Sequence, residues 1–318
     1  MELRHLRSFQ AVATNRSFTR AANELGYVQS AITSHVKALE ADLGVRLFDR
    51  LGRRIVITEA GSELLAYATK ILDLTDSARA AVAYGGQPSG TLRISASETL
   101  CTYRLPPVLK EFGKRFPGVR LVFEPSRNGT LDPTLRRRLS EGAVDAAFVI
   151  ERERIDLGGL VSEILVREPL VLVAYPDHPL AEADGVRPAD LTQESVLMAE
   201  KGCGFRELFE EQMARAGVKP KAEIEFTSSE AIKRCVEGGM GVAVLAAVSV
   251  AEEIRSGRLA VLDWSEPNFF VATRMLRHGD RWLSPALGAF LDTARDVFGV
   301  GKDPRQVGSD LPVVEGAR

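Results

Sequence analysis

Hydrophobic side chains recur with a helical period over the first 45 residues of the chain. They fall into three stripes, which consist of Leu3, Leu6, Phe9 and Ala13, then Phe18, Ala21, Ala22 and Leu25, then Ile32, Val36, Leu39 and Leu43. Ser17 suits the N-cap of the second stripe and Gly26 interrupts the pattern after it, so we expect short helices that begin and end there. Two short helices joined by a glycine-containing turn form the outline of a helix-turn-helix.

The third stripe predicts a helix with small and amide side chains on its outer face. These residues are Gln29, Ser30, Thr33, Ser34 and Lys37. Side chains of this kind can approach base edges in the major groove, and glutamine can pair with adenine through two hydrogen bonds. A solvated helix face would show the same pattern, so the face alone leaves both interpretations open.

A basic segment follows the three predicted helices. Arg50, Arg53 and Arg54 surround Gly52, and residues 55–57 are β-branched, as in a strand. We therefore predict a β-hairpin whose arginines can reach phosphates or a minor groove. Because this hairpin comes directly after a helix-turn-helix outline, DNA binding is the preferred interpretation of the whole segment.

The next segment has hydrophobic positions with heptad spacing. They are Leu64, Ala68, Ile71, Thr75, Ala78 and Val82. Thr58 and Glu59 offer a helix start, while glycines and a proline at 85–90 supply a stop and a hinge. A heptad seam predicts a helix that pairs two chains. A helix packed against its own domain is the alternative, because alanine and threonine make a weak seam.

The remainder of the chain alternates strands with helices. We expect strands at 91–95, 119–123 and 146–150 around helices at 105–116 and 131–139. The pattern recurs about 100 residues later, with strands at 195–199, 222–226 and 242–245 around helices at 205–215 and 229–237. This order predicts parallel sheets in two similar α/β subdomains. Residues 170–174 would supply the crossover, and residues 269–275 would return the chain to the first subdomain.

Ligands of such sheets lie beyond the carboxyl ends of the strands. This rule selects four loops, at 97–99, 126–130, 202–204 and 227–229. The candidate residues are Ser97, Glu98, Thr99, Cys101, Asn128, Thr130, Gly202, Cys203, Phe205, Thr227 and Ser228. Helix N-termini with free N–H groups favour a polar or anionic small molecule. The same small residues could also be ordinary loop and capping residues.

One cysteine of these loops suggests a second kind of chemistry. Cys203 is expected at a helix N-terminus with Arg206 nearby, and both features would lower its pKa. We therefore consider a redox-sensing function that uses Cys203 and also Cys101. The alternative is that Cys203 is a small loop residue without reactivity.

Composition and charge narrow the function further. The 318 residues carry a net charge of −2, but residues 1–60 hold nine Lys and Arg against six Asp and Glu, so a +3 head joins a −5 body. The longest apolar run, 242–248, is far shorter than the ~20 residues of a membrane span. The three widely spaced cysteines make no disulfide framework, and the N-terminus lacks the apolar region of a signal peptide. We expect a cytoplasmic protein.

Enzyme signatures are weak. His5, His35, His178 and His278 are too dispersed for a metal cluster, and neither GxSxG nor a P-loop occurs. We expect no enzymatic activity, no cofactor and no metal. A binding or redox-sensing protein with secondary DNA contact, and an enzyme built on the α/β repeat, are the competing hypotheses.

The N-terminal motifs resemble those of LysR-type transcriptional regulators. The matching runs are Ser17 to Ala22, Gln29 to Thr33, Leu39-Glu40, Gly44 to Arg50 and Thr58 to Gly61. The resemblance implies a winged helix-turn-helix with Arg53 in the wing. The candidate DNA contacts are Ser17, Thr19, Arg20, Gln29, Ser30, Thr33, Ser34, Lys37, Arg50, Arg53 and Arg54. One departure is Val28, since the family usually has a capping Ser or Thr there.

The resemblance continues more loosely in Leu105-Pro106, 139–145, 178–181 and 236–241. It implies a periplasmic-binding-protein-like effector domain, a homodimer or homotetramer, an operator with dyad symmetry, and RNA polymerase as a further candidate partner. The expected domains are 1–58 (winged helix-turn-helix), 59–87 (linker helix) and 88–300 (effector domain). The subdomains would comprise 88–163 plus 268–300, and 164–267, and we expect 301–318 to be a disordered tail.

Overall fold

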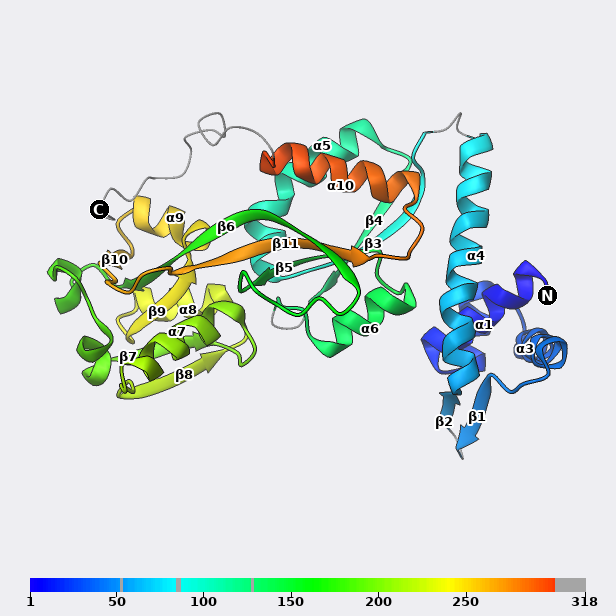
Figure 1. Cartoon of the computed structure of the whole chain (residues 1–318), viewed down its shortest axis with the longest axis horizontal. Helices are drawn as coiled ribbons and strands as arrows, with labels where there is room; N and C mark the ends of the chain where they lie inside the picture. The colour runs from blue at the N-terminus through cyan, green and yellow to red at the C-terminus, as the bar shows by residue number, and fades with distance from the viewer. Residues whose placement is uncertain (52–53, 84–86, 127–128, 301–318) are drawn as a thin grey trace.

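The computed structural model describes residues 1–51, 54–83, 87–126 and 129–300. An N-terminal head and an elongated α/β body are joined through one long helix (Figure 1). The head consists of α1 (Leu3–Asn15), α2 (Phe18–Leu25), α3 (Gln29–Leu43), and a hairpin of β1 (Phe48–Leu51) and β2 (Arg54–Ile57). The long helix is α4 (Glu59–Ala83). The predicted tail at 301–318 lies outside the described residues.

The three hydrophobic stripes of the head converge on one small core. Phe48, from the base of the hairpin, packs against Phe9 of α1 and Phe18 of α2, with ring centroids 5.3 and 6.0 Å apart. The hydroxyl of Ser17 accepts a hydrogen bond from the Arg20 N–H at 3.3 Å and so caps α2. Helix α3 starts at Gln29, and its N-cap residue Val28 makes no side-chain capping bond. The winged helix-turn-helix outline is confirmed, including the missing cap.

One part of the heptad seam of α4 packs against the head, and another face of the helix is exposed. Ala68 is fully buried, and Leu64 and Ile71 are half-buried against the head core. This part of the seam packs on its own domain, as the alternative interpretation proposed. Leu74 and Val82, by contrast, are 54% and 88% exposed. Only the exposed face of α4 is therefore available to a second chain.

The first subdomain of the body is built around three parallel strands. They are β3 (Gly90–Ala96), β4 (Val119–Pro125) and β5 (Ala146–Glu151), with β3 in the middle. Its helices are the π-helix η1 (Leu100–Arg104), α5 (Leu105–Arg115), α6 (Pro133–Glu141) and α10 (Pro285–Phe298). Phe112 of α5 meets Phe290 of α10 edge-on at 5.0 Å, which closes the core on that side.

The second subdomain repeats the arrangement. Its parallel strands are β7 (Ser195–Ala199), β8 (Ala222–Phe226) and β9 (Val242–Ala246), with β7 in the middle. Its other elements are the short helices η2 (Pro179–Glu182) and η3 (Pro188–Gln193), then α7 (Gly204–Arg215), α8 (Ser229–Glu237), α9 (Ala247–Arg255) and β10 (Ala260–Leu262). The two halves of the predicted repeat are thus confirmed.

Two long antiparallel strands join the subdomains. They are β6 (Leu160–Ala174) and β11 (Phe270–His278), which pair from Leu160 to Pro169 with a register shift between Thr273 and Arg274. The sheet order is β4-β3-β5-β11-β6-β9-β7-β8, so one continuous sheet runs through both halves (Figure 1). The crossover is therefore a 15-residue strand rather than the short piece expected at 170–174. In the described parts of the chain, no helix is long and apolar enough to cross a membrane.

Candidate DNA-binding face and effector pocket

The outer face of α3 presents polar side chains around Gln29. Gln29, Ser30, Ser34 and Lys37 are exposed, and Thr33 is half-buried. The Thr19 hydroxyl of α2 donates to Oε1 of Gln29 at 3.1 Å. This bond occupies the amide oxygen of Gln29 and leaves its NH₂ group without an acceptor among the described residues. The two helices of the motif therefore position Gln29 together.

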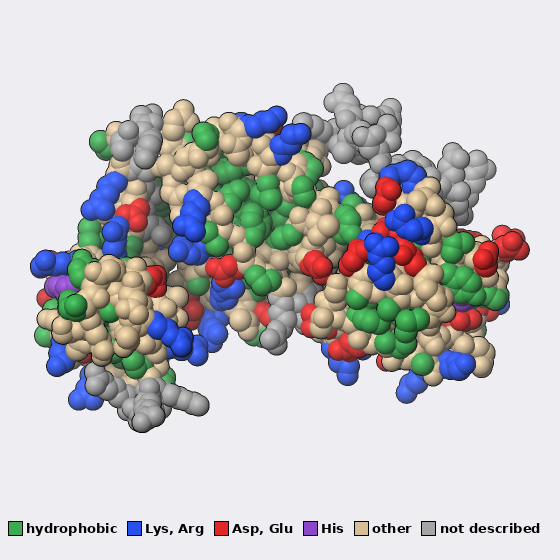
Figure 2. Space-filling view, turned by 180° about the vertical axis from the view of Figure 1, so that it is seen from behind, with side chains coloured by type: hydrophobic (Ala, Val, Ile, Leu, Met, Phe, Trp, Pro, Cys, Tyr) green, Lys and Arg blue, Asp and Glu red, His purple; other side chains and the backbone are tan. Residues whose placement is uncertain are grey.

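Two basic side chains near this face are available to phosphates. Arg20 and Lys37 are exposed and form no ion pair with any described residue. Arg7, in contrast, is paired with Asp76 of α4 at 2.5 Å. Lys and Arg side chains lie around the head on the face shown in Figure 2. Unpaired cations near a protruding helix favour binding to a phosphate backbone.

Four further candidates for DNA contact lie at the start of α2 and in the hairpin. Ser17 uses its hydroxyl oxygen to cap α2, so its position is explained without DNA. Arg50 and Arg54 lie on the paired strands of the hairpin, in register with Ile55 and Leu51. Arg53 lies outside the described residues.

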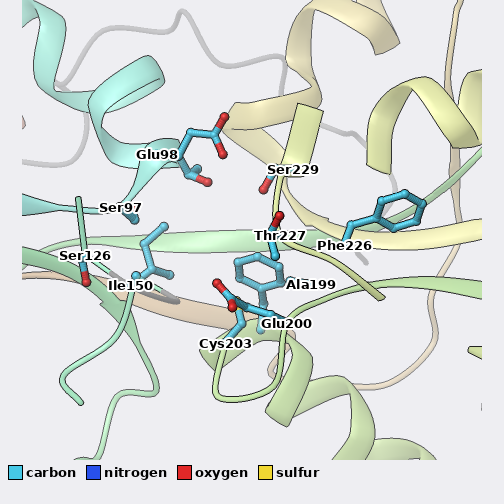
Figure 3. A pocket seen from close by; sticks show the side chains of 13 residues that line it. Ser97, Glu98, Ser126, Ile150, Ala199, Glu200, Cys203, Phe226, Thr227 and Ser229 are labelled. Carbon is cyan, nitrogen blue, oxygen red and sulfur yellow. The ribbon is translucent and has the colours of Figure 1, made fainter. Parts of the chain in front are cut away.

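A pocket opens between the two subdomains of the body (Figure 3). Its lining residues are Ser97, Glu98, Thr99, Ser126, Gly129, Ile150, Ala199, Glu200, Cys203, Phe205, Phe226, Thr227 and Ser229. Its cavity volume is about 80 Å³. One water requires about 10–15 Å³, so the pocket has room for a small metabolite.

All four predicted loops contribute to this pocket. Ser97, Glu98 and Thr99 follow β3, Cys203 and Phe205 begin α7, and Thr227 follows β8. Some candidates lie beside the lining rather than in it, namely Cys101, Thr130, Gly202 and Ser228. Asn128 lies outside the described residues. The strand-end rule therefore locates the pocket from sequence, although it does not separate lining residues from their neighbours.

Ser126, Gly129 and Ser229 line the pocket from the predicted loops 126–130 and 227–229, although they were not among the candidate residues. The lining residues outside the predicted loops were missed, and they are Ile150, Ala199, Glu200 and Phe226. Ile150 lies at the penultimate position of β5, and Ala199 and Phe226 are the last residues of β7 and β8. A strand-end residue borders the crevice as closely as the loop after it. The same rule, extended back by one or two residues, would have found these three.

The pocket lining contains the carboxylates of Glu98 and Glu200 and, among the described residues, no Lys or Arg. It also contains the hydroxyls of Ser97, Thr99 and Thr227. The polar or anionic effector expected from the sequence stays a prediction.

The expected low pKa of Cys203 is wrong. Its side chain is 5% exposed at the N-cap of α7, and burial raises the pKa of the thiol to about 12. Neighbouring carboxylates of Glu151 and Glu200 add to the increase. Arg206 does not offset it, because its guanidinium pairs with Glu210 and Glu225 at 2.7 and 2.6 Å. Burial also raises the pKa of Cys101.

Two polar networks start from the π-helix η1, which follows the pocket loop 97–99. Arg104 donates two hydrogen bonds to Glu168 of β6, at 2.7 and 2.5 Å, and Thr273 of β11 donates a third at 3.0 Å. Tyr103 is hydrogen-bonded to the ammonium of Lys233 in α8 at 2.9 Å. The segment that follows the pocket loop 97–99 is therefore tied both to the joining strands and to the opposite subdomain.

In the part of the chain that the structure describes, no group of three or more His, Cys, Asp or Glu side chains is placed so that it could hold a metal ion.

Family models match both parts of the molecule. Residues 3–62 match the model described as "Bacterial regulatory helix-turn-helix protein, lysR family", and residues 85–299 match "LysR substrate binding domain". The chain belongs to the LysR family. This LysR-family chain is similar to YwqM of Bacillus subtilis, an uncharacterized HTH-type transcriptional regulator. The two are 39% identical over an alignment that covers 94% of this chain and all of YwqM.

Solved structures show the same fold. Full-length OxyR of Pseudomonas aeruginosa matches with a TM-score of 0.71 and 24% identity, over 94% of this chain and 95% of that one. The regulatory domain of CcmR from Synechocystis PCC6803, in complex with 2-PG, matches with a TM-score of 0.59 and 29% identity. That match covers 68% of this chain and all of the other. This LysR-family chain is accordingly a transcriptional regulator with an effector-binding domain.

Proposed function

We propose that this LysR-family regulator reads a dyad-symmetric operator with its head and changes its DNA binding when a small polar effector occupies the pocket between the subdomains. The observation that carries the proposal is the pocket itself, where four separate loops at strand ends meet in a chain that also bears a winged helix-turn-helix. The coupling would be a two-state rearrangement of the body, biased by the effector's preference for one state. Its action would take place in the cytoplasm, where operator DNA lies.

The head supplies both parts of operator recognition. Gln29, oriented by Thr19, and the neighbouring Thr33 would read base edges, while Arg20, Lys37 and the wing arginines would contact phosphates. A single winged helix reads one half-site, so a second copy is needed for a dyad. Tyr67, Leu74 and Val82 on the exposed face of α4 offer an apolar surface for that pairing, as a homodimer or homotetramer.

A mobility-shift titration with the intergenic DNA beside the gene tests this assignment. Gln29→Ala should relax sequence preference by about tenfold, because a good base contact contributes about 1–3 kcal/mol of discrimination. Lys37→Ala should weaken binding to all sequences and reduce the salt slope by about one. Lys219→Ala, an exposed lysine of the body, is the matched control and should bind as wild type does. Wild-type binding by both head variants would show that the assigned face is wrong.

The redox alternative depends on Cys203, whose thiol belongs to the pocket wall. The raised pKa of this thiol opposes rapid reaction with peroxides, since the thiolate is the reactive form. We therefore place effector binding ahead of redox sensing.

A further inference from the structure

We propose that Thr19 determines which base Gln29 recognises, because it restricts the Gln29 amide to donating hydrogen bonds and so makes guanine the preferred base. This inference rests on the proposed function, in which Gln29 of α3 reads a base edge, and it names the chemistry of that base. The Thr19 hydroxyl donates to Oε1 of Gln29 at 3.1 Å. Thr19 is therefore a positioning residue, which acts on DNA through Gln29.

The position of Thr19 in α2 explains why its hydroxyl bonds to another helix. A threonine inside a helix often donates to the carbonyl four residues earlier, as Thr33 does to Gln29 at 2.9 Å. Thr19 is the second residue of α2, and the residue four positions earlier, Asn15, is the last residue of α1. The Thr19 hydroxyl is therefore not used within its own helix and can donate to a side chain of α3.

A tight turn between α2 and α3 supports this contact. Gly26 ends α2 with a φ of +68°, and the next residue, Tyr27, donates a backbone hydrogen bond to Ala22 at 2.9 Å. This is the usual closure of a helix that ends in a left-handed residue. Gln29 then begins α3. Because the turn is closed by the backbone, a side-chain change at Thr19 should leave the path of the chain intact.

The bond changes what the Gln29 amide can offer to DNA. A glutamine has one carbonyl oxygen that accepts and an NH₂ group that donates twice. Pairing with adenine through two hydrogen bonds needs both groups, because the adenine edge presents the N7 acceptor beside the N6 amino donor. Since Thr19 engages the oxygen, the two N–H donors remain for a base.

A group that only donates discriminates among the four bases. In the major groove guanine presents two neighbouring acceptors, N7 and O6, whereas thymine presents O4 alone and cytosine only an amino donor. Adenine offers one acceptor, and its amino group would face the Gln29 donors. Guanine therefore satisfies both N–H groups, and a G·C pair is the expected partner of Gln29.

The same bond orders the Gln29 side chain before DNA binds. Both Thr19 and Gln29 are exposed, and an exposed glutamine without a partner samples several rotamers. Ordering such a side chain at an interface costs free energy, so a residue that is already ordered binds more favourably. Removal of the Thr19 hydroxyl should therefore lower affinity for the preferred operator in addition to changing the preferred base.

Selection by the full chain from a randomised operator library, followed by sequencing, tests the proposal. The base pair read by Gln29 is the one at which Gln29→Ala removes the preference. Wild type should prefer G·C there, in either orientation, over A·T by about tenfold. Thr19→Val keeps the shape of the side chain without its hydroxyl, and it should shift this ratio toward A·T by about tenfold, because the freed oxygen can accept from adenine.

Thr19→Ser is the matched control, since it retains the hydroxyl and should keep the G·C preference. Unchanged melting temperatures would verify that both variants fold. A wild-type preference for A·T overturns the proposal, as does an unchanged preference in Thr19→Val. An equal loss of affinity for every sequence in Thr19→Val overturns it too, because a hydroxyl that contacts a phosphate acts in that way. If Gln29→Ala removes the preference at no position, the proposed function fails instead, because the base-reading face is then wrong.

Discussion

The ion pair between Arg104 and Glu168 offers a direct test of what ties the first subdomain to the joining strands. Glu168 lies on β6 and its side chain is 1% exposed, whereas Arg104 at the end of η1 retains 18%. Two hydrogen bonds from the guanidinium and one from the Thr273 hydroxyl satisfy this carboxylate. Glu168→Gln keeps the shape of the side chain and the Thr273 bond but removes the charge.

The expected cost follows from the burial. Removing one partner of a buried ion pair costs about 3–5 kcal/mol, because the remaining charge is left uncompensated. The partial exposure of Arg104 lets water relieve some of this penalty, which places the cost near the lower end, at about 3 kcal/mol. With about 2–4 °C per kcal/mol for a domain of this size, the melting temperature should fall by about 6–12 °C.

Urea unfolding followed by tryptophan fluorescence, to which Trp264 and the more exposed Trp282 contribute, would measure this change. Trp264 is half-buried in the second subdomain, where its indole N–H donates to Gln212 at 3.0 Å. The double variant Arg104→Met with Glu168→Leu is the critical control, since replacing both partners by apolar groups is often neutral or stabilising. A Glu168→Gln variant within about 0.5 kcal/mol of wild type, or a double variant less stable than the single one, would refute the reasoning.

Three further outcomes follow from the structure. At pH 8, iodoacetamide should modify Cys203 about a thousandfold more slowly than an unburied thiol, because a thiol with a pKa of about 12 holds little thiolate at that pH. If peptide mass spectrometry found Cys203 as reactive as the half-buried Cys235, the result would contradict this and favour redox sensing. Leu74→Glu should shift sedimentation toward the monomer without lowering the melting temperature, since Leu74 is 54% exposed in one chain; an unchanged sedimentation coefficient would move the interface elsewhere. Gly241→Ala should destabilise the body by about 2 kcal/mol or more, because a Cβ there would lie 2.1 Å from the Ser195 carbonyl oxygen and φ is +151°; a melting curve like that of wild type would be inconsistent with this backbone.

The strands and helices of the repeat were predicted well because local pattern and tertiary burial agree there. The ranges 195–199, 222–226 and 229–237 coincide with β7, β8 and α8. The central strand β6 was underestimated because polar residues interrupt its apolar pattern. Glu163 and Glu168 are compensated by Arg295 and Arg104, more than 60 residues distant in the chain. Partners of that kind arise only from the fold, so the local pattern looked like a loop.

The pocket, too, was predicted only in part from the sequence. Its position followed from topology, since strand ends of the repeat define the crevice. Its chemistry did not, because charge state depends on orientation and burial. Arg206 lies three residues after Cys203, yet its guanidinium turns to Glu225, 19 residues further along the chain. Sequence proximity suggested an activated thiol, whereas packing produced a buried and protonated one.

The path of the chain through the joining strands has a consequence for its synthesis. In the finished sheet β5 lies between β3 and β11, but 118 residues separate the end of β5 at Glu151 from the start of β11 at Phe270. At about 5–20 residues per second, a ribosome takes about 6–24 s to make them. During that interval β5 has an unpaired edge, which can pair with other chains. The second subdomain, by contrast, has all its parallel strands by Ala246 and can fold before release.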